Sequence, residues 1–142
     1  MRKLLKVLVL TSALSLPACN GGDDSATPAS LGQEFVIRYG ETIRIDNLLL
    51  EFTSVLEESR CPVNAICVWE GNARLVFTAS QGQTTRALEL NTTPPFPTTA
   101  IFEGYVIELR ELQPYPGAVI TKPLPLAYVA TLFVDGLVLP AN

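Results

Sequence analysis

Residues 105–112, Tyr-Val-Ile-Glu-Leu-Arg-Glu-Leu, are the stretch that decides the expected fold. The apolar side chains of Tyr105, Ile107 and Leu109 alternate here with side chains that are mostly charged. A period of two residues places the apolar side chains on one face of an extended chain, whereas a helix would distribute them around its axis. The stretch therefore predicts a β-strand with one face in a core and the other in water.

The same alternation recurs on both sides of this strand. Towards the amino terminus it appears in shorter runs, at 35–37, 43–45, 48–52, 73–79 and 88–90. Towards the carboxyl terminus, residues 128–134 are apolar on both faces, which predicts a central strand. Asp135-Gly136 then predicts a tight turn into 137–139, and Asp46-Asn47 predicts a turn after 43–45.

These runs predict an all-β domain over residues 34–142. Turn residues every eight to twelve residues or so are typical of an antiparallel β-sandwich or small barrel, here of about seven to eight strands. No segment has helical periodicity long enough to favour a helix bundle. The proline-rich stretches 91–97 and 113–117 should be surface connections, because proline cannot donate to a central ladder.

The amino terminus has a different composition. Arg2, Lys3 and Lys6 precede an apolar stretch over 7–16, which is the layout of a secretory signal. The stretch is too short to cross a bilayer, since a spanning helix needs about 20 apolar residues.

Residues 16–19, Leu-Pro-Ala-Cys, resemble the lipobox of bacterial lipoproteins. In that class a diacylglycerol is attached to the cysteine sulfur, the leader is removed before the cysteine, and the new amino terminus is often acylated. Pro17 departs from the pattern, because a small residue is usual there. The resemblance covers only the first nineteen residues and implies a signal peptide at 1–18 and lipidation of Cys19. Ordinary secretion is the alternative, although Leu16 fits its small-x-small rule poorly.

The segment after the cysteine fits a lipid anchor. Residues 20–30 are polar and rich in small residues, so we expect 19–33 to be a flexible tether. We therefore expect a lipid-anchored protein of the bacterial cell envelope, with its domain outside the cytoplasm. Asn20 after the lipidated cysteine fits transfer to the outer membrane in a Gram-negative host.

The charge excludes several classes of partner. Three of the ten basic residues lie in the leader, so the mature chain keeps seven basic and fourteen acidic residues, a formal charge of −7. Such a chain lacks the basic footprint that binds nucleic acid or anionic lipid, so membrane attachment should come from the amino-terminal lipid alone. The chain also has no histidine, the commonest general base and metal ligand.

Residues 58–73, Glu-Ser-Arg-Cys-Pro-Val-Asn-Ala-Ile-Cys-Val-Trp-Glu-Gly-Asn-Ala, hold the densest group of special residues. We expect a disulfide between Cys61 and Cys67, the even pair left once Cys19 carries lipid. Pro62 and Asn64 can turn the chain back between them. A loop this small adds only about 2 kcal/mol, so the bond should set local shape.

This stretch resembles one found in small secreted bacterial proteins of uncharacterised function. There, Ser-Arg-Cys-Pro, a second cysteine and Trp-x-Gly follow one another, as they do here at 59–62, Cys67 and 69–71. The resemblance covers about sixteen residues. It implies a strand entry pinned by a disulfide in a β domain, and it implies no activity.

Three interpretations of the stretch compete. In the structural one, which we favour, the disulfide pins an irregular strand entry, Trp69 fills the core and Gly71 makes a bulge. In the binding one, Glu58, Arg60, Trp69 and Glu70 form a surface recognition patch. A redox or metal role is the third, but two cysteines without histidine cannot complete a zinc shell, and their spacing is not that of thiol oxidoreductases.

Catalysis is not expected, and neither is a cofactor or a metal. A nucleophile needs a base beside it, and the mature chain offers no histidine and one lysine, Lys122. Glu57, Glu58 and Glu70 could pair for glycoside chemistry, but carboxylates near arginine on a strand edge are far more often solvated ion pairs.

The sequence therefore predicts a lipid-anchored, non-catalytic structural or binding module whose partner is an envelope protein. One alternative is an inhibitor of secreted hydrolases that uses the disulfide-closed loop 61–67, because a preorganised loop enters a cleft with little ordering cost. Another is a small-molecule carrier, which would need a cavity between the sheets.

Overall fold

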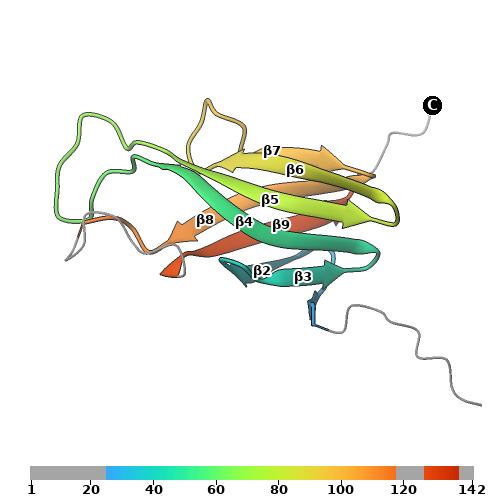
Figure 1. Cartoon of the computed structure of the whole chain (residues 1–142). Coiled ribbons are helices and arrows are strands. Elements are labelled where there is room, and N and C mark those ends of the chain that lie inside the picture. The colour runs from blue at the N-terminus through green and yellow to red at the C-terminus, as the bar shows by residue number, and fades with distance from the viewer. Residues whose placement is uncertain (1–24, 118–126, 138–142) are drawn as a thin grey trace, which may run out of the picture.

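The structure is a computed structural model that describes residues 25–117 and 127–137. The expected signal peptide, 1–18, and Cys19 lie outside the described residues. The described residues form nine strands in two sheets, which confirms the predicted all-β sandwich (Figure 1). The two sheets do not close into a barrel. No helix in this part of the chain is long and apolar enough to cross a membrane.

The first sheet has five strands in the order β1-β3-β4-β5-β6. Their bounds are Thr27–Ala29 (β1), Thr42–Ile45 (β3), Leu48–Glu58 (β4), Ala73–Gln81 (β5) and Thr84–Asn91 (β6). The second sheet has four strands in the order β2-β9-β8-β7. Their bounds are Gln33–Arg38 (β2), Val129–Gly136 (β9), Tyr105–Gln113 (β8) and Thr99–Phe102 (β7). Neighbouring strands are antiparallel, except that β1 runs parallel to β3.

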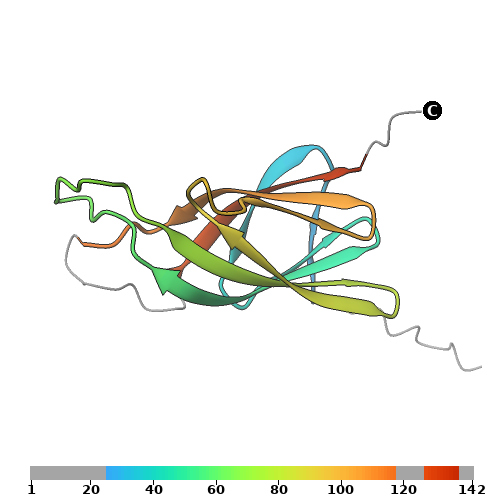
Figure 2. The same ribbon diagram turned by 90° about the horizontal axis from the view of Figure 1, so that it is seen from above.

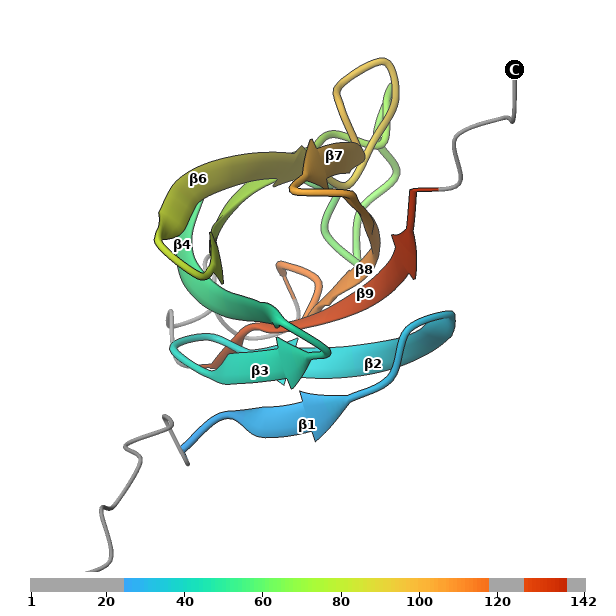
Figure 3. The ribbon, with the colours of Figure 1, turned by 90° about the vertical axis from the view of Figure 1, so that its right-hand side faces the viewer.

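The core lies between the two sheets, which curve around it when viewed along the strands (Figure 3). Ile107 and Leu109 of β8 point into it, as their alternation predicts. Phe52 and Phe77 stack across β4 and β5 with ring centroids 4.9 Å apart. Each such side chain contributes about 1.5–3 kcal/mol by leaving water. Strand β9 lies between β2 and β8, which confirms the prediction of a central strand.

Two expectations about local structure are wrong. Asp135 and Gly136 do not form a turn, because β8 extends opposite them and pairs them with Val106 and Tyr105. The described β structure also begins before residue 34, at Thr27, inside the expected tether. Strand β1 pairs with the edge of β3, so the backbone N–H and C=O groups along that edge have hydrogen-bond partners. The three residues of β1 are too few to show a strand pattern in the sequence.

The connection between β4 and β5, residues 59–72, is the most prominent departure from the sandwich. It projects beyond the ends of both sheets, as the yellow-green loop in Figure 2 shows. We refer to residues 59–72 as the finger. On the same end of the molecule lie the last residue of β8 and the loop that follows it, residues 113–117 (Figure 1).

Candidate functional site

The base of the finger continues the β4–β5 ladder. The backbone N–H of Ser59 donates to the carbonyl of Asn72 at 2.8 Å, and that of Cys61 donates to the carbonyl of Glu70 at 2.7 Å. Between these bonds Gly71 has a φ of 73°, and a β-carbon there would lie 1.9 Å from the Ser59 carbonyl oxygen. Only glycine fits this left-handed position against the opposite backbone.

The tip of the finger is closed by the predicted disulfide. Cys61 and Cys67 are bonded, with their α-carbons 5.9 Å apart. A turn starts at Pro62, whose carbonyl accepts a hydrogen bond from the Ala65 N–H at 3.0 Å. The bond therefore links the start of the tip to its end and limits its conformations.

A buried ion pair holds the finger to the sandwich. The side chains of Glu58 and Arg60 are each 2% exposed, and Arg60 donates to both Glu58 oxygens, from Nε at 2.8 Å and from Nη2 at 2.5 Å. Arg60 also donates to the carbonyls of Leu112 and Pro114, the latter at 2.8 Å. The charges are thus paired and hydrogen-bonded, as burial requires.

Tyr128, just before β9, completes this network. Its hydroxyl donates to Glu58 Oε2 at 3.2 Å, and its ring is buried. Burial first, and the nearby Glu58 carboxylate second, raise the pKa of Tyr128 to about 12. Both causes disfavour a tyrosinate, so the hydroxyl keeps its proton and its bond to Glu58.

The loop after β8 braces the finger from the side. The Val63 N–H donates to the Pro116 carbonyl at 3.1 Å, and the Tyr115 ring lies over the Arg60 guanidinium at 4.4 Å. Pro114 is exposed as predicted, but Pro116 is buried, because the finger covers this part of the loop.

The structure divides the predicted recognition patch of Glu58, Arg60, Trp69 and Glu70. Glu58 and Arg60 are buried beneath the finger and cannot be surface contacts, whereas Trp69 and Glu70 are exposed. The expectation that Trp69 fills the core is also wrong, since the residue is 57% exposed. Trp69 lies on the finger, which projects beyond the ends of both sheets (Figure 2), so the core between the sheets does not extend to it.

Trp69 belongs instead to an exposed apolar cluster at the end of the finger. Val63 is 63% exposed, and Ile66 and Val68 are fully exposed. We refer to Val63, Ile66, Val68 and Trp69 as the apolar tip. The prediction of a loop that enters clefts included Val63 and Ile66, but Val68 was missed. A signal for it exists in the sequence, because 66–69 are apolar without any polar alternation.

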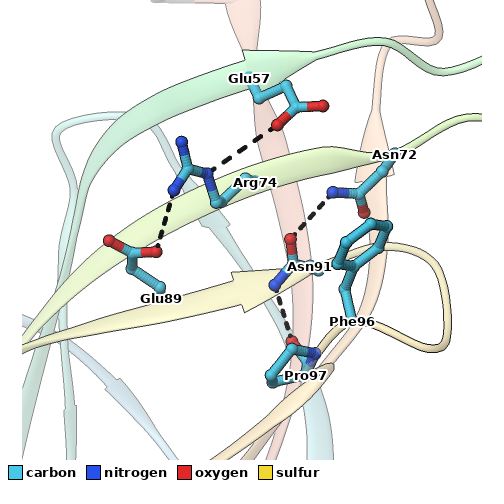
Figure 4. A pocket seen from close by; sticks show the side chains of 7 residues that line it. All are labelled: Glu57, Asn72, Arg74, Glu89, Asn91, Phe96 and Pro97. Carbon is cyan, nitrogen blue, oxygen red and sulfur yellow. Dashed lines mark hydrogen bonds and ion pairs between the residues drawn. The ribbon is translucent and has the colours of Figure 1, made fainter.

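A second feature lies on the outer face of the first sheet, next to the base of the finger. It is a groove lined by Glu57, Asn72, Arg74, Glu89, Asn91, Phe96 and Pro97 (Figure 4). We refer to it as the outer groove. Neither Arg74 nor Phe96 was singled out in the sequence, since the lining comes from three strands, the last residue of the finger (Asn72) and the loop after β6.

The three carboxylates considered for glycoside chemistry have different surroundings. Glu57 lines the outer groove, Glu58 is buried with Arg60, and Glu70 is exposed on the finger. Within residues 25–117 and 127–137, no group of three or more His, Cys, Asp or Glu side chains is placed to hold a metal ion.

Comparisons with known proteins give no match, whether to family models, to curated proteins or to solved structures. The geometry and chemistry of the finger and the outer groove are therefore the basis on which a function can be assigned.

Proposed function

We propose that this protein is a lipid-anchored, non-catalytic binding module of the bacterial cell envelope that contacts a partner protein through its apolar tip. The observation that carries the proposal is the full exposure of Ile66 and Val68 on a loop held in one shape. Clustered apolar side chains that remain in water mark interaction sites, and tryptophan is enriched among the residues that contribute most to binding.

The way the finger is held supports a binding role. The disulfide, the two ladder bonds and the Glu58–Arg60 pair fix the finger before any partner arrives. Few side chains then become ordered on association. Each side chain that is already ordered in the free protein spares the binding free energy an entropic cost of about 0.5–1.5 kcal/mol. The exposed apolar surface is thus presented at low entropic cost.

Charge favours a protein over a bilayer as the occupant. The only basic residue of the finger, Arg60, is buried, and the exposed charged residue beside the apolar tip is Glu70. An acidic mature chain is repelled by anionic headgroups, which attract basic segments. A flat contact between two copies is also disfavoured, because four side chains fall well short of the roughly 800 Å² per partner of a stable interface. A concave apolar pocket on another protein fits the apolar tip better.

The direction of the finger agrees with an anchor at the amino terminus. Thr27 of β1 is level with Ile43, and Ile43 with Leu50, which precedes Glu58 by eight residues. At about 3.3 Å per residue, the base of the finger lies about 26 Å along the sheet from Thr27. A domain tethered through the residues before Thr27 can therefore present its finger away from the bilayer.

The test is capture of partners from envelope extract with the lipidated protein, followed by binding of the purified candidate. Ile66→Asp should weaken binding at least about tenfold, since it places a charge in an apolar pocket. Ile101→Asp is the matched control, because Ile101 is 54% exposed on β7, away from the finger. A partner that binds both variants as well as the wild type would contradict the proposal.

The anchor has its own test. Mass spectrometry of the protein from the producing cell should show an acylated glycerol on Cys19 and no leader. An intact leader, or an unmodified Cys19, would remove the membrane from the proposal and leave the binding role of the finger to be judged separately.

A second candidate is an inhibitor of secreted hydrolases that inserts the loop 61–67. The observation in its favour is that residues 63–66 all point into solvent, as insertion into a cleft requires. Purified proteases assayed with micromolar domain decide between the two. Inhibition that Ile66→Asp abolishes supports this candidate, and an unaffected panel removes it. No observation favours a small-molecule carrier, and large side chains such as Phe52 and Phe77 fill the space between the sheets.

A further inference from the structure

We infer that the outer groove is a binding site for a short neutral saccharide, distinct from the apolar tip and independent of the partner proposed for that tip. The groove crosses three strands on the outer face of the first sheet. Glu57 comes from β4, Arg74 from β5 and Glu89 from β6, while the loop that follows β6 supplies Phe96 and Pro97 (Figure 4).

The charged side chains of the groove are held in place before a ligand binds. Arg74 lies between two carboxylates, with Nε 4.0 Å from Glu57 and Nη1 3.4 Å from Glu89. Glu57 in turn accepts a hydrogen bond from the Ser59 hydroxyl at 3.1 Å. The Nε of Arg74 is buried and has no hydrogen-bond partner among the described residues, whereas the side chain as a whole is 41% exposed.

The wall that carries Phe96 is fixed by two buried amides. Asn72 donates to the side-chain oxygen of Asn91 at 2.9 Å, and Asn91 donates to the Pro97 carbonyl at 3.1 Å. Asn72 and Asn91 are 2% and 5% exposed, so their role is to position the loop. The ring of Phe96, which is 43% exposed, therefore forms a stable apolar surface beside the charged row.

The chemistry of the groove matches a neutral polyol. Two carboxylates and one guanidinium nearly balance, and they alternate acceptors with donors along the groove. Vicinal hydroxyls of a sugar both donate and accept, so they can bridge a carboxylate and a guanidinium, whose planar geometry favours paired contacts. The C–H face of the sugar can pack on Phe96. An anionic ligand would be repelled by Glu57 and Glu89, whose charges outweigh that of Arg74 by one. Both carboxylates already face Arg74, so a cationic ligand would have to compete with the guanidinium for them.

The chain contains a matched control on its other sheet. Arg110 lies 3.5 Å from Glu34 and 2.9 Å from Glu108, over the ring of Phe133 at 5.1 Å. This cluster repeats the charges and the aromatic ring of the groove, but it lies on a different sheet and is not part of the groove lining. If binding depends on the groove, replacing Arg74 should weaken it and replacing Arg110 should not.

The experiment is an NMR titration of the mature protein with triacetylchitotriose, cellotriose and maltotriose as neutral probes. At least one should shift the signals of Arg74 Nε–H, the Asn72 and Asn91 side-chain amides and residues 92–98. Phe96→Ala should weaken that binding about tenfold, a loss equal to one stacking contact of about 1.4 kcal/mol. Phe96→Tyr should retain the binding, because it keeps the ring, and Arg110→Met should leave it unchanged.

Three outcomes would overturn the inference. The first is that none of the neutral probes shifts these signals at about 1 mM, the weak end of specific affinity. The second is an equal loss of binding in Arg74→Met and Arg110→Met. The third is tighter binding of trilysine or of an oligogalacturonate. Ile66→Asp should leave saccharide binding intact, so failure here is distinguishable from failure of the proposed partner contact at the finger.

Discussion

At the scale of single residues, Arg60 joins the finger to the sandwich. It ties Glu58 of β4 to the carbonyls of Leu112 and Pro114 at the end of β8, so three segments meet at one guanidinium. A buried charge has this effect only while all its partners are present, because an unpaired buried charge is strongly unfavourable. The position of the finger therefore depends on the buried contacts of Arg60 at its base, and not on the residues that the finger exposes.

Arg60→Met should lower the free energy of unfolding by about 3–5 kcal/mol, since it leaves Glu58 buried without its counter-ion. Urea denaturation measures the loss. Arg38→Met is the matched control, because the Arg38–Glu41 pair spans 3.8 Å with Arg38 68% exposed and should contribute at most about 1 kcal/mol. Equal losses in the two variants would contradict the assigned role of Arg60.

Tyr128 predicts a dependence of stability on alkaline pH. The pKa of Tyr128 is about 12 in the folded protein, against 10.0 for an ordinary tyrosine. The folded state thus holds its proton where the unfolded state loses it, so this contribution is complete below pH 10 and is lost as the pH rises towards 12. Denaturation across this range should show the fall in wild type and a smaller fall in Tyr128→Phe. Some fall should persist there, because burial, followed by the hydrogen bond to Asp46, also raises the pKa of Tyr105. An unchanged profile in Tyr128→Phe would refute the assignment.

Gly71 should tolerate no side chain. Gly71→Ala places a β-carbon against the Ser59 carbonyl at a φ of 73°, so we expect a loss of more than about 2 kcal/mol in thermal unfolding. Gly82→Ala shares a positive φ, 58°, but meets no atom within 4 Å, and it should cost about 1 kcal/mol. Equal losses of thermal stability in the two variants would show that the close approach of Gly71 to the Ser59 carbonyl does not affect stability.

At the scale of elements, the finger extends the β4–β5 hairpin without the support of a second sheet. The two sheets are stabilised by the core between them, whereas within residues 25–117 and 127–137 the finger is held by its base contacts, the loop 113–117 and the disulfide. Its local stability should thus be separable from that of the sandwich, as is common for binding loops.

Replacing both Cys61 and Cys67 with serine tests this separation. The global stability should fall by about 2 kcal/mol at most, because the closed loop is short. Hydrogen exchange of the Cys61 position, whose N–H donates to Glu70, should accelerate much more than that of the core strands. Uniform acceleration through both sheets would show that the finger and the sandwich unfold as one unit.

At the scale of the whole molecule, the two ends of the sandwich differ. The finger and the loop 113–117 occupy one end, and the turn between β3 and β4 lies at the other (Figure 1). The apolar tip is exposed but small, so residues 20–142 produced without any lipid should be a monomer at micromolar concentration. Analytical ultracentrifugation measures this directly. A dimer that Ile66→Asp dissociates would identify a second copy as the occupant of the tip.

Much of the strand pattern was predictable because alternation is local. Residues 105–112 and 128–134 carry enough of it to identify β8 and β9 and to place β9 centrally. The Asp46-Asn47 turn is confirmed by the φ of 52° at Asp46 and the pairing of β3 with β4. The short strands β1 and β7 escaped prediction, because three or four residues contain too little alternation to be distinguished from loop.

The sequence by itself determined the fold class and the disulfide, because side-chain alternation and a spacing of six residues act over short distances along the chain. Tertiary structure alone decided which polar residues are buried and which apolar residues stay in water. Glu58 and Arg60 are buried because β8 and Tyr128 close over them, and Trp69 is exposed because it lies on the finger, beyond the two described sheets. The outer groove exists only because packing brings Glu57, Arg74, Glu89 and Phe96 together. Burial depends on what lies opposite a residue in space, and the residues nearby in sequence do not specify it.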